Sequence, residues 1–444
     1  MRIESIAIPM IRQVVKRPRL ADYLFRFDRW GNPFSLEAVA NPQISLDLMR
    51  QDDPVVWRAP YQQWFVHGYD EAREVLASPH VGTANQMDTL LDVRPYNQLN
   101  ERSQSFFRNL MLLTDPPQHT RLRKLVNRAF TPRQVTRLEP RLEEMADRLI
   151  AGFGDEVELM GDFATEFPAA VISELLGFGH GEWRWLDAAG QVLVQALDPF
   201  RGFDPAEMGT AVATFGDRIL AAAEERRLDP GEDVLTGLAL AEADGDRLSE
   251  DELVSVAGLI LVAGFETTAM MFGYALMALH DHPDQLELIR ERPDLWPNAV
   301  EEILRYETSV RSDPRTALED FELAGKQIKA GQNILVMNHA ANRDRRRFAD
   351  ADELRLDREN PSPISFGHGI HYCLGANLAR AELRIGLPRL IEALGDYRID
   401  RDRIVWRESI TLPGPARLPI RTGERAAATP RVPVRSRAGS SPSK

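Results

Sequence analysis

The longest apolar stretch of the chain, from Ser249 to Leu279, constrains its fold more than any other feature. It reads VSVAGLILVAGF, then ETT at residues 266–268, then AMMFGYALMAL, and Pro283 follows shortly after. Ser249 and Glu252 have the spacing of a capping box, and further acidic residues lie in the first turn. The sequence therefore predicts one long helix that begins after Ser249 and ends before Pro283.

A run of about 20 apolar residues would also suit a transmembrane helix. Against that interpretation, the preceding flank is acidic, and a carboxylic acid with two hydroxyl groups stands in the middle of the run. We expect instead a helix buried in the centre of a globular protein, and no membrane span. A buried carboxylic acid is costly unless it is hydrogen-bonded or functional, so Glu266 is either a satisfied core residue or a working acid.

Helical periodicity covers most of the chain, as in residues 138–153, where apolar residues recur mostly at three- and four-residue steps. Short strand patterns occur at 55–57 with 64–66, and at 321–323, 327–328 and 333–337. We therefore expect a mainly α fold with small β-sheets. Residues 41–423 are predicted to form one domain after an N-terminal segment, residues 1–40.

The formal net charge of −13 argues against general nucleic-acid binding. Residues 424–444 hold five basic residues and one acid without apolar periodicity, and we expect a disordered basic tail. A single cysteine excludes intramolecular disulfides and fits a reducing compartment. The apolar patch near the N-terminus is broken by Pro9 and ended by Arg12, too short for a signal segment. We expect a cytoplasmic protein.

The only cysteine, Cys373, lies in the glycine-rich stretch SFGHGIHYCLGANLARAELR, residues 365–384. A helix is predicted from Leu374, which would place the thiol at a helix N-terminus, where unpaired N–H groups and the helix dipole favour a thiolate. A lone cysteine without such surroundings is more often simply buried.

The stretch FGHGIHYCLG resembles the haem-binding signature of the cytochrome P-450 family: Phe, Gly, x, Gly, x, His or Arg, x, Cys, x, Gly. The following ANLAR is typical of the soluble bacterial branch. The resemblance implies a cytochrome P-450 fold in which haem b lies between the long central helix and the cysteine loop. It implies Cys373 as axial ligand of the haem iron. The haem-contacting loop residues would be Phe366, Gly367, His371 and Gly375, and Gly369 fills the remaining glycine position of the signature.

Two further motifs follow the order of the family. AGFETT, from Ala263, resembles the oxygen-activating motif, which implies roles for Thr267 in oxygen activation and for Glu266 in connecting the pocket to a proton source. Gly264 would leave room above the iron, and Thr267 can bond back to the carbonyl group of Ala263. The pair Glu302 and Arg305 resembles the family's Glu-x-x-Arg pair, with Arg358 as the third, structural member.

The resemblance also implies haem-propionate contacts and a substrate pocket. The propionate contacts would be His119, Arg123, Arg315 and His371. The pocket residues would be Leu259, Ala263, Val310 and Leu412, all apolar, with residues 80–103 as a variable lid. One departure is Arg345 after Ala-Asn-Arg-Asp, where the family often has Pro; it bears on a local turn.

The implied activity is that of a haem-thiolate monooxygenase which inserts one atom of O2 into an apolar small molecule. One cysteine cannot hold a four-cysteine cluster, so electrons would come from a ferredoxin and an NAD(P)H-dependent reductase. Such a partner would dock on a basic patch, for which the candidates are Arg121, Lys124, Arg128, Arg380 and Arg384. Two alternatives stay open: a peroxide-dependent haem-thiolate oxidase, and a non-catalytic haem- or ligand-binding protein.

Overall fold

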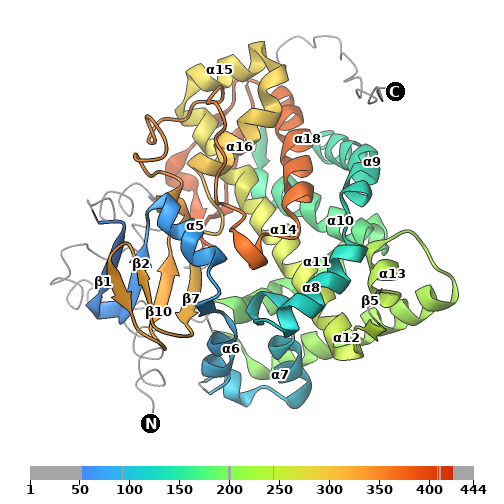
Figure 1. The fold of residues 1–444 in the computed structure, drawn as a ribbon. Coiled ribbons are helices and arrows are strands. Elements are labelled where there is room, and N and C mark those ends of the chain that lie inside the picture. Colours follow the sequence, from blue (N-terminus) through green and yellow to red (C-terminus); the bar gives the residue numbers. More distant parts are fainter. Residues whose placement is uncertain are drawn as a thin grey trace, which may run out of the picture.

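The computed structural model describes residues 53–92, 94–198, 202–243, 245–407, 409 and 412–423. The predicted N-terminal segment and the predicted basic tail lie outside these residues. Figure 1 shows a large helical body with a small sheet at one side. The fold is mainly α with small β-sheets, as predicted. The single domain over residues 41–423 stays a prediction.

The predicted central helix is α14, Glu250–Asp281, which runs through the middle of the helical body (Figure 1). Ser249 caps it and Glu252 completes the capping box, as expected. By length and composition α14 could cross a membrane, but 78% of its most apolar window is buried inside the protein. The helix is therefore the core element that the interrupted apolar pattern predicts.

The other helices surround α14 or cover the sheet. Those in the first half are α5 Tyr69–Ala77, α6 Ala84–Leu91, α7 Glu101–Arg108, α8 Gln118–Ala129, α9 Pro132–Ile150, α10 Glu166–Leu175, α11 Trp183–Leu193 and α12 Pro205–Leu228. Those in the second half are α13 Val234–Ala239, α15 Pro283–Glu291, α16 Trp296–Tyr306, α17 Asn338–Ala341 and α18 Ala376–Leu394. Helices α10, α11, α12 and α18 all pack on α14.

The largest sheet has five strands in the order β1-β2-β10-β7-β3. Its strands are β1 Val55–Arg58, β2 Gln63–Val66, β3 Val81–Gly82, β7 Asp313–Ala317 and β10 Asn333–Val336. The predicted pairing of 55–57 with 64–66 is present as an antiparallel ladder. Strand β7, which carries Arg315, was not predicted. It forms because β10 and β3 pair with its two edges.

Four smaller sheets complete the fold. One has three strands in the order β11 Arg398–Ile399, β14 Pro419–Arg421 and β4 Glu156–Glu158. The others are two-stranded: β5 Glu242–Ala243 with β6 Asp246–Arg247, β8 Phe321–Leu323 with β9 Lys326–Ile328, and β12 Val405–Trp406 with β13 Pro415–Arg417. The β8–β9 pair is the predicted one at 321–328. The β12–β13 pair brings the C-terminal region close to α14, since the Tyr274 hydroxyl group of α14 donates to the Pro413 carbonyl group at 2.9 Å.

Candidate functional site

The cysteine loop is a tight backbone turn that ends at α18. The Cys373 N–H donates to the Phe366 carbonyl group at 2.9 Å, which closes the loop. Gly367 and Gly369 have φ values of +70° and +72°, in the left-handed region that favours glycine. A Cβ atom at Gly369 would lie 2.3 Å from the Leu76 carbonyl oxygen, so this loop position must be glycine for the loop to pack against α5.

The helix after Cys373 begins two residues later than predicted. Gly375, not Cys373, stands at the N-cap, and α18 starts at Ala376. Burial raises the pKa of the Cys373 thiol, and this effect outweighs the backbone hydrogen bond at Gly375 and the charges of Arg123 and Arg380, which lower it. In the absence of a metal ion, the surroundings of Cys373 therefore favour the thiol over the expected thiolate.

Four residues predicted to contact haem propionates come together beside this loop. The His119 and His371 rings have centroids 4.3 Å apart. Burial, followed by the charges of His119, Arg315 and Arg123, lowers the pKa of His371 to about 3. Arg123 donates to the Tyr372 carbonyl group at 2.8 Å, which ties α8 to the loop.

These four residues fit an anionic group. Both ring nitrogens of His119 and the Nε2 atom of His371 are buried without a hydrogen-bond partner. Buried polar atoms are normally satisfied, and two guanidinium groups stand in the same cluster. The haem carboxylates have the charge and the acceptor atoms that such a cluster requires.

Four positions of α14 stand out because they are not buried while the rest of its central part is. These are Leu259, Ala263, Gly264 and Thr267, which together span about 2.2 turns of the helix. The Thr267 hydroxyl group donates to the Ala263 carbonyl oxygen at 2.8 Å, as predicted. At Gly264 a Cβ atom would lie 2.4 Å from Ile172 Cδ1, so the glycine also makes room for α10.

Glu266, unlike these four residues of α14, is buried. Its side chain is 1% exposed and forms an ion pair with Arg407. Gln191 of α11 also donates to its Oε1 atom at 3.0 Å. Neither partner was identified from the sequence, because each is far from Glu266 along the chain. The acid is thus satisfied in the core by two partners.

The structural triad has the predicted contacts. Glu302 and Arg305 are fully buried and lie 2.7 Å apart, and the Arg358 Nε atom lies 3.0 Å from Glu302. Arg305 also donates to the carbonyl groups of Asn342 and Ala351 at 3.0 and 2.8 Å. The triad therefore fixes α16 to the long connection that precedes the cysteine loop.

Val310 and Leu412, the two other predicted pocket residues, are partly buried. Val310 follows α16, and its carbonyl group accepts from Asn338 at 3.3 Å. Leu412 lies between β12 and β13, and its N–H donates to Ser409 at 3.0 Å. Leu412 therefore belongs to the same hairpin that carries Arg407.

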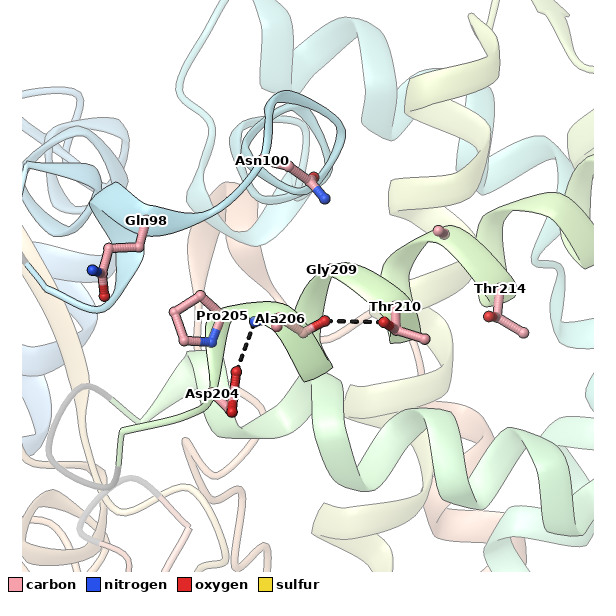
Figure 2. A pocket seen from close by; sticks show the side chains of 9 residues that line it. Gln98, Asn100, Asp204, Pro205, Ala206, Gly209, Thr210 and Thr214 are labelled. Carbon is pink, nitrogen blue, oxygen red and sulfur yellow. Dashed lines mark hydrogen bonds between the residues drawn. The ribbon is translucent and has the colours of Figure 1, made fainter.

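The predicted lid, residues 80–103, contains β3, α6 and the start of α7, and it borders a pocket of about 700 Å³. Figure 2 shows that this pocket lies between residues 98–100 and the first turns of α12, with Asp204, Thr210 and Thr214 on the α12 side. It includes none of the predicted site residues. The pocket is therefore a recess beside the lid and not the haem site.

One further acid near the site was missed by the sequence analysis. Glu382 of α18 is 1% exposed, and its Oε2 atom lies 3.4 Å from the Thr268 hydroxyl oxygen of α14. Its other oxygen is buried without a partner. Only its spacing on the buried face of α18 could have indicated it, since Leu378, Ala381 and Ile385 are buried on the same helix.

Comparisons with known proteins identify the family of this chain. The family described as Cytochrome P450 matches residues 211–395. 6-Deoxyerythronolide B hydroxylase of Saccharopolyspora erythraea is 38% identical over 81% of this chain and 90% of that protein. Vitamin D(3) 25-hydroxylase of Pseudonocardia autotrophica is 38% identical over 87% of this chain and 95% of that protein.

Two further relatives extend the comparison. The polyketide biosynthesis cytochrome P450 PksS of Bacillus subtilis is 33% identical over 88% of this chain and 98% of that protein. The crystal structure of CalO2 superimposes with a TM-score of 0.82 at 31% identity, covering 88% of this chain and 98% of that one. The chain therefore belongs to the cytochrome P450 family, and it is a haem-thiolate monooxygenase that acts on small molecules.

Proposed function

We propose that the site holds haem b with Cys373 as the axial ligand, and that the chain oxygenates an apolar substrate with O2. The electrons would come from a ferredoxin and its NAD(P)H-dependent reductase. The meeting of His119, Arg123, Arg315 and His371 beside the Cys373 loop carries this proposal. Three ring nitrogens of the two histidines are buried there without partners, as a site for carboxylates requires.

Haem, when bound, supplies the oxygen-activating chemistry, and a thiolate ligand favours cleavage of the O–O bond. The residues of the chain bind and orient it. Cys373 would hold the iron as a thiolate, because the thiolate is the form of cysteine that ligates a metal. The positive charge of Arg123 and the backbone hydrogen bond at Gly375 both favour that deprotonated form.

Thr267 and Glu266 are proposed to handle protons above the haem. The Thr267 hydroxyl group donates its hydrogen to the Ala263 carbonyl group. The Thr267 hydroxyl oxygen can therefore accept a hydrogen bond on the exposed side of α14. Glu266 would provide the acid that renews protons in the pocket, a positioned acid–base task.

The substrate is proposed to be a sizeable apolar molecule. The predicted pocket residues Leu259, Ala263, Val310 and Leu412 are all apolar, which suits a ligand held mainly by burial. Among the substrate classes that the sequence left open (fatty acids, terpenoids, steroids and polyketides), the names of the relatives favour a polyketide or a vitamin D-like molecule. Both hydroxylation and epoxidation fit the site.

The electron donor is proposed to dock on the surface of the Cys373 loop. Ile370 and Tyr372 are 49% and 40% exposed there, unusual for large apolar side chains. The expected basic patch is weaker than the sequence indicated. Three of its members already have acidic partners: Arg121 with Asp246 and Glu252, Arg380 with Glu301, and Arg384 with Glu139. A ferredoxin would therefore rely on apolar contacts as well as charge. We also propose a cytoplasmic location, since the single cysteine fits a reducing compartment.

The test is spectroscopic. Protein purified with haem should show the red-shifted absorption of a thiolate-ligated ferrous CO complex. Titration with a library of polyketides, secosteroids, steroids, terpenoids and fatty acids should give a low-spin to high-spin shift for the substrate class. Absence of the red-shifted band in folded, haem-loaded protein would contradict the proposal.

A further inference from the structure

The side of α14 that carries Thr267 continues beyond the motif to Tyr274. Thr267, Met270 and Tyr274 follow one another at steps of three and four residues, so their side chains share one side of the helix. Tyr274 lies about 10 Å beyond Thr267 along the helix axis, at ~1.5 Å per residue. Thr267 is partly exposed, whereas Tyr274 is only 2% exposed. Other segments of the chain therefore cover this side of α14 beyond the motif.

One of these segments is the β12–β13 hairpin, which packs closely on α14. A Cβ atom at Gly414 would lie 2.2 Å from the Met270 sulfur atom, and one at Gly273 would lie 2.9 Å from Pro415 Cγ. The strands of the hairpin have two and three residues, and their pairing is irregular. Because a short two-stranded hairpin is marginally stable by itself, its position depends on contacts with the rest of the protein.

The Tyr274 hydroxyl group joins this hairpin to the segment that follows α16. It donates to the Pro413 carbonyl group at 2.9 Å and accepts from the Arg311 Nη2 atom at 2.9 Å. The proposed pocket residues Leu412 and Val310 are the direct neighbours of Pro413 and Arg311 along the chain. One buried oxygen atom thus links two backbone segments that lie far apart in the sequence and that each carry a pocket residue.

The directions of the two hydrogen bonds follow from the chemistry of the groups. A guanidinium group only donates, so the Tyr274 oxygen is the acceptor of the bond from Arg311. Burial raises the pKa of Tyr274 to about 12, and the charge of Arg311 opposes this only in part. The hydroxyl group therefore keeps its proton and donates it to the Pro413 carbonyl group. A phenylalanine at position 274 would lack both hydrogen bonds.

The Arg311 segment is fixed from its other side by α17. The Arg311 carbonyl group accepts from the His339 N–H at 3.3 Å. The Asn338 side chain donates to the Val310 carbonyl group at 3.3 Å and to Asp313 at 2.9 Å. This segment is therefore held by α17, whereas the hairpin rests on α14, and the Tyr274 hydroxyl group is a contact at which the two meet.

We propose that Tyr274 is a positioning residue for the substrate, and that its hydroxyl group sets the spacing between the Val310 segment and the Leu412 hairpin. This inference rests on the proposed pocket, of which these two segments would be walls. Tyr274 is buried and acts through the walls that it joins. A bulky apolar ligand needs both walls in place, because walls that are loose must be ordered when the ligand binds. A small ligand of the haem iron has no such requirement.

The first experiment measures hydrogen exchange by mass spectrometry in the haem-loaded protein. Tyr274→Phe should raise the exchange of backbone amides in residues 308–313 and 405–417 by about tenfold, the range expected for the loss of a buried hydrogen bond to a charged group. Tyr397→Phe is the matched control, since Tyr397 is also buried and its hydroxyl group donates to the Leu276 carbonyl group of α14 at 2.8 Å. This control should leave the exchange of both segments unchanged.

A double variant tests whether the two contacts act through one hydroxyl group. Arg311→Gln alone should also raise the exchange of the hairpin. The combined variant with Tyr274→Phe should show less than the sum of the two single effects, because both substitutions remove the same hydrogen bond. Additive effects would mean that Tyr274 and Arg311 hold the hairpin independently, which would contradict the inference.

The second experiment compares two ligands of the haem iron, imidazole and clotrimazole, whose binding shifts the haem absorption band. Imidazole is small, whereas clotrimazole carries several aromatic rings that must fit between the walls. Tyr274→Phe should weaken the binding of clotrimazole by about tenfold and leave that of imidazole unchanged. Tyr397→Phe should change neither affinity. A purely structural role of Tyr274 would lower the thermal midpoint without separating the two ligands.

The outcomes separate this inference from the proposed function. Exchange in the two segments that is the same in Tyr274→Phe and the wild type would overturn the inference. So would a clotrimazole affinity that does not fall relative to the imidazole affinity, or one that is no higher than the imidazole affinity in the wild type. In each case the red-shifted CO band of the wild type would leave the proposed haem site standing. Absence of that band would contradict the proposed function itself.

Discussion

The carboxyl group of Glu382 lies 3.4 Å from the hydroxyl group of Thr268, inside the protein and next to Thr267. The contact joins the helix that follows the cysteine ligand to the helix that carries the oxygen-activating motif. Thr268 itself donates to the Gly264 carbonyl group at 3.3 Å. Three arginines of α18 form ion pairs with acidic residues of α9 and α16. These pairs are Arg380–Glu301, Arg384–Glu139 and Arg389–Asp147.

Glu382 is therefore expected to be a neutral acid in the folded protein. Burial raises its pKa well above the usual 4.5, and the Thr268 hydrogen bond opposes this only in part. The unfolded chain releases this proton above about pH 4.5, whereas the folded chain keeps it. The wild type is thus destabilised progressively as pH rises above 4.5, and there is no such penalty below it.

The variant Glu382→Gln lacks this pH-dependent destabilisation. Its advantage in unfolding free energy over the wild type should grow by up to about 1.4 kcal/mol per pH unit. Denaturant unfolding at several pH values measures it, and a constant difference would show that Glu382 is ionised when folded.

Cys373→Ala should remove the red-shifted band of the reduced CO complex, because no other cysteine is present to provide a thiolate. Circular dichroism should show a folded helical protein, which separates loss of the ligand from loss of the fold. Survival of the band in this variant would mean that the ligand is assigned to the wrong residue.

Removing the donors at the haem carboxylates should weaken haem retention. Each charge-assisted hydrogen bond contributes about 1.5–3 kcal/mol, so Arg123→Gln should release haem about tenfold or more faster. Transfer of haem to apomyoglobin measures the rate. Arg128→Gln is the control, since Arg128 lies on the same helix and, among the described residues, bonds to the Glu242 carbonyl group. Equal rates in the two variants would place the carboxylates elsewhere.

Thr267→Ala should uncouple electron use from product formation once a binding compound is identified. The variant loses the hydroxyl oxygen that faces the exposed side of α14, so NADPH should be consumed with release of hydrogen peroxide. Thr267→Ser, which keeps the hydroxyl group, should restore much of the coupling. An enzyme that normally uses peroxide would show no difference among the three proteins, which makes this the test of that alternative.

Glu302→Ala should destabilise the fold severely, because it leaves the buried Arg305 and Arg358 side chains without their carboxylate. Breaking a buried pair in this way costs about 3–5 kcal/mol. Glu301→Ala, one residue away, breaks only the partly exposed pair with Arg380 and should cost about 1 kcal/mol or less. Thermal unfolding of the two variants compares them directly, and similar midpoints would contradict the structural role of the triad.

The sequence predicted best those contacts that join residues close together along the chain. The Ser249 capping box, the Thr267 bond to Ala263, and the Glu302–Arg305 pair each join residues three or four positions apart, where helix geometry determines the contact. The start of α18 was placed two residues early. The loop ends with Gly375 at the N-cap, so the helix cannot begin at Leu374.

Contacts between distant residues could not be predicted in this way. Arg407 is 141 positions from Glu266, and Glu382 is 114 positions from Thr268. The basic patch was overestimated for the same reason, because Arg384 is 245 positions from the acid that pairs with it. Arg315 lies in a strand that no local pattern indicated, since its neighbours β10 and β3 create that strand.

Gly369 has a consequence for the choice of electron donor. Because the loop touches the Leu76 carbonyl group at that glycine, the loop has no space to retreat toward α5 when another protein presses on it. Ile370 and Tyr372 therefore present a surface whose shape exists before any partner arrives. An electron donor that docks here, as proposed, would have to match that shape as it stands.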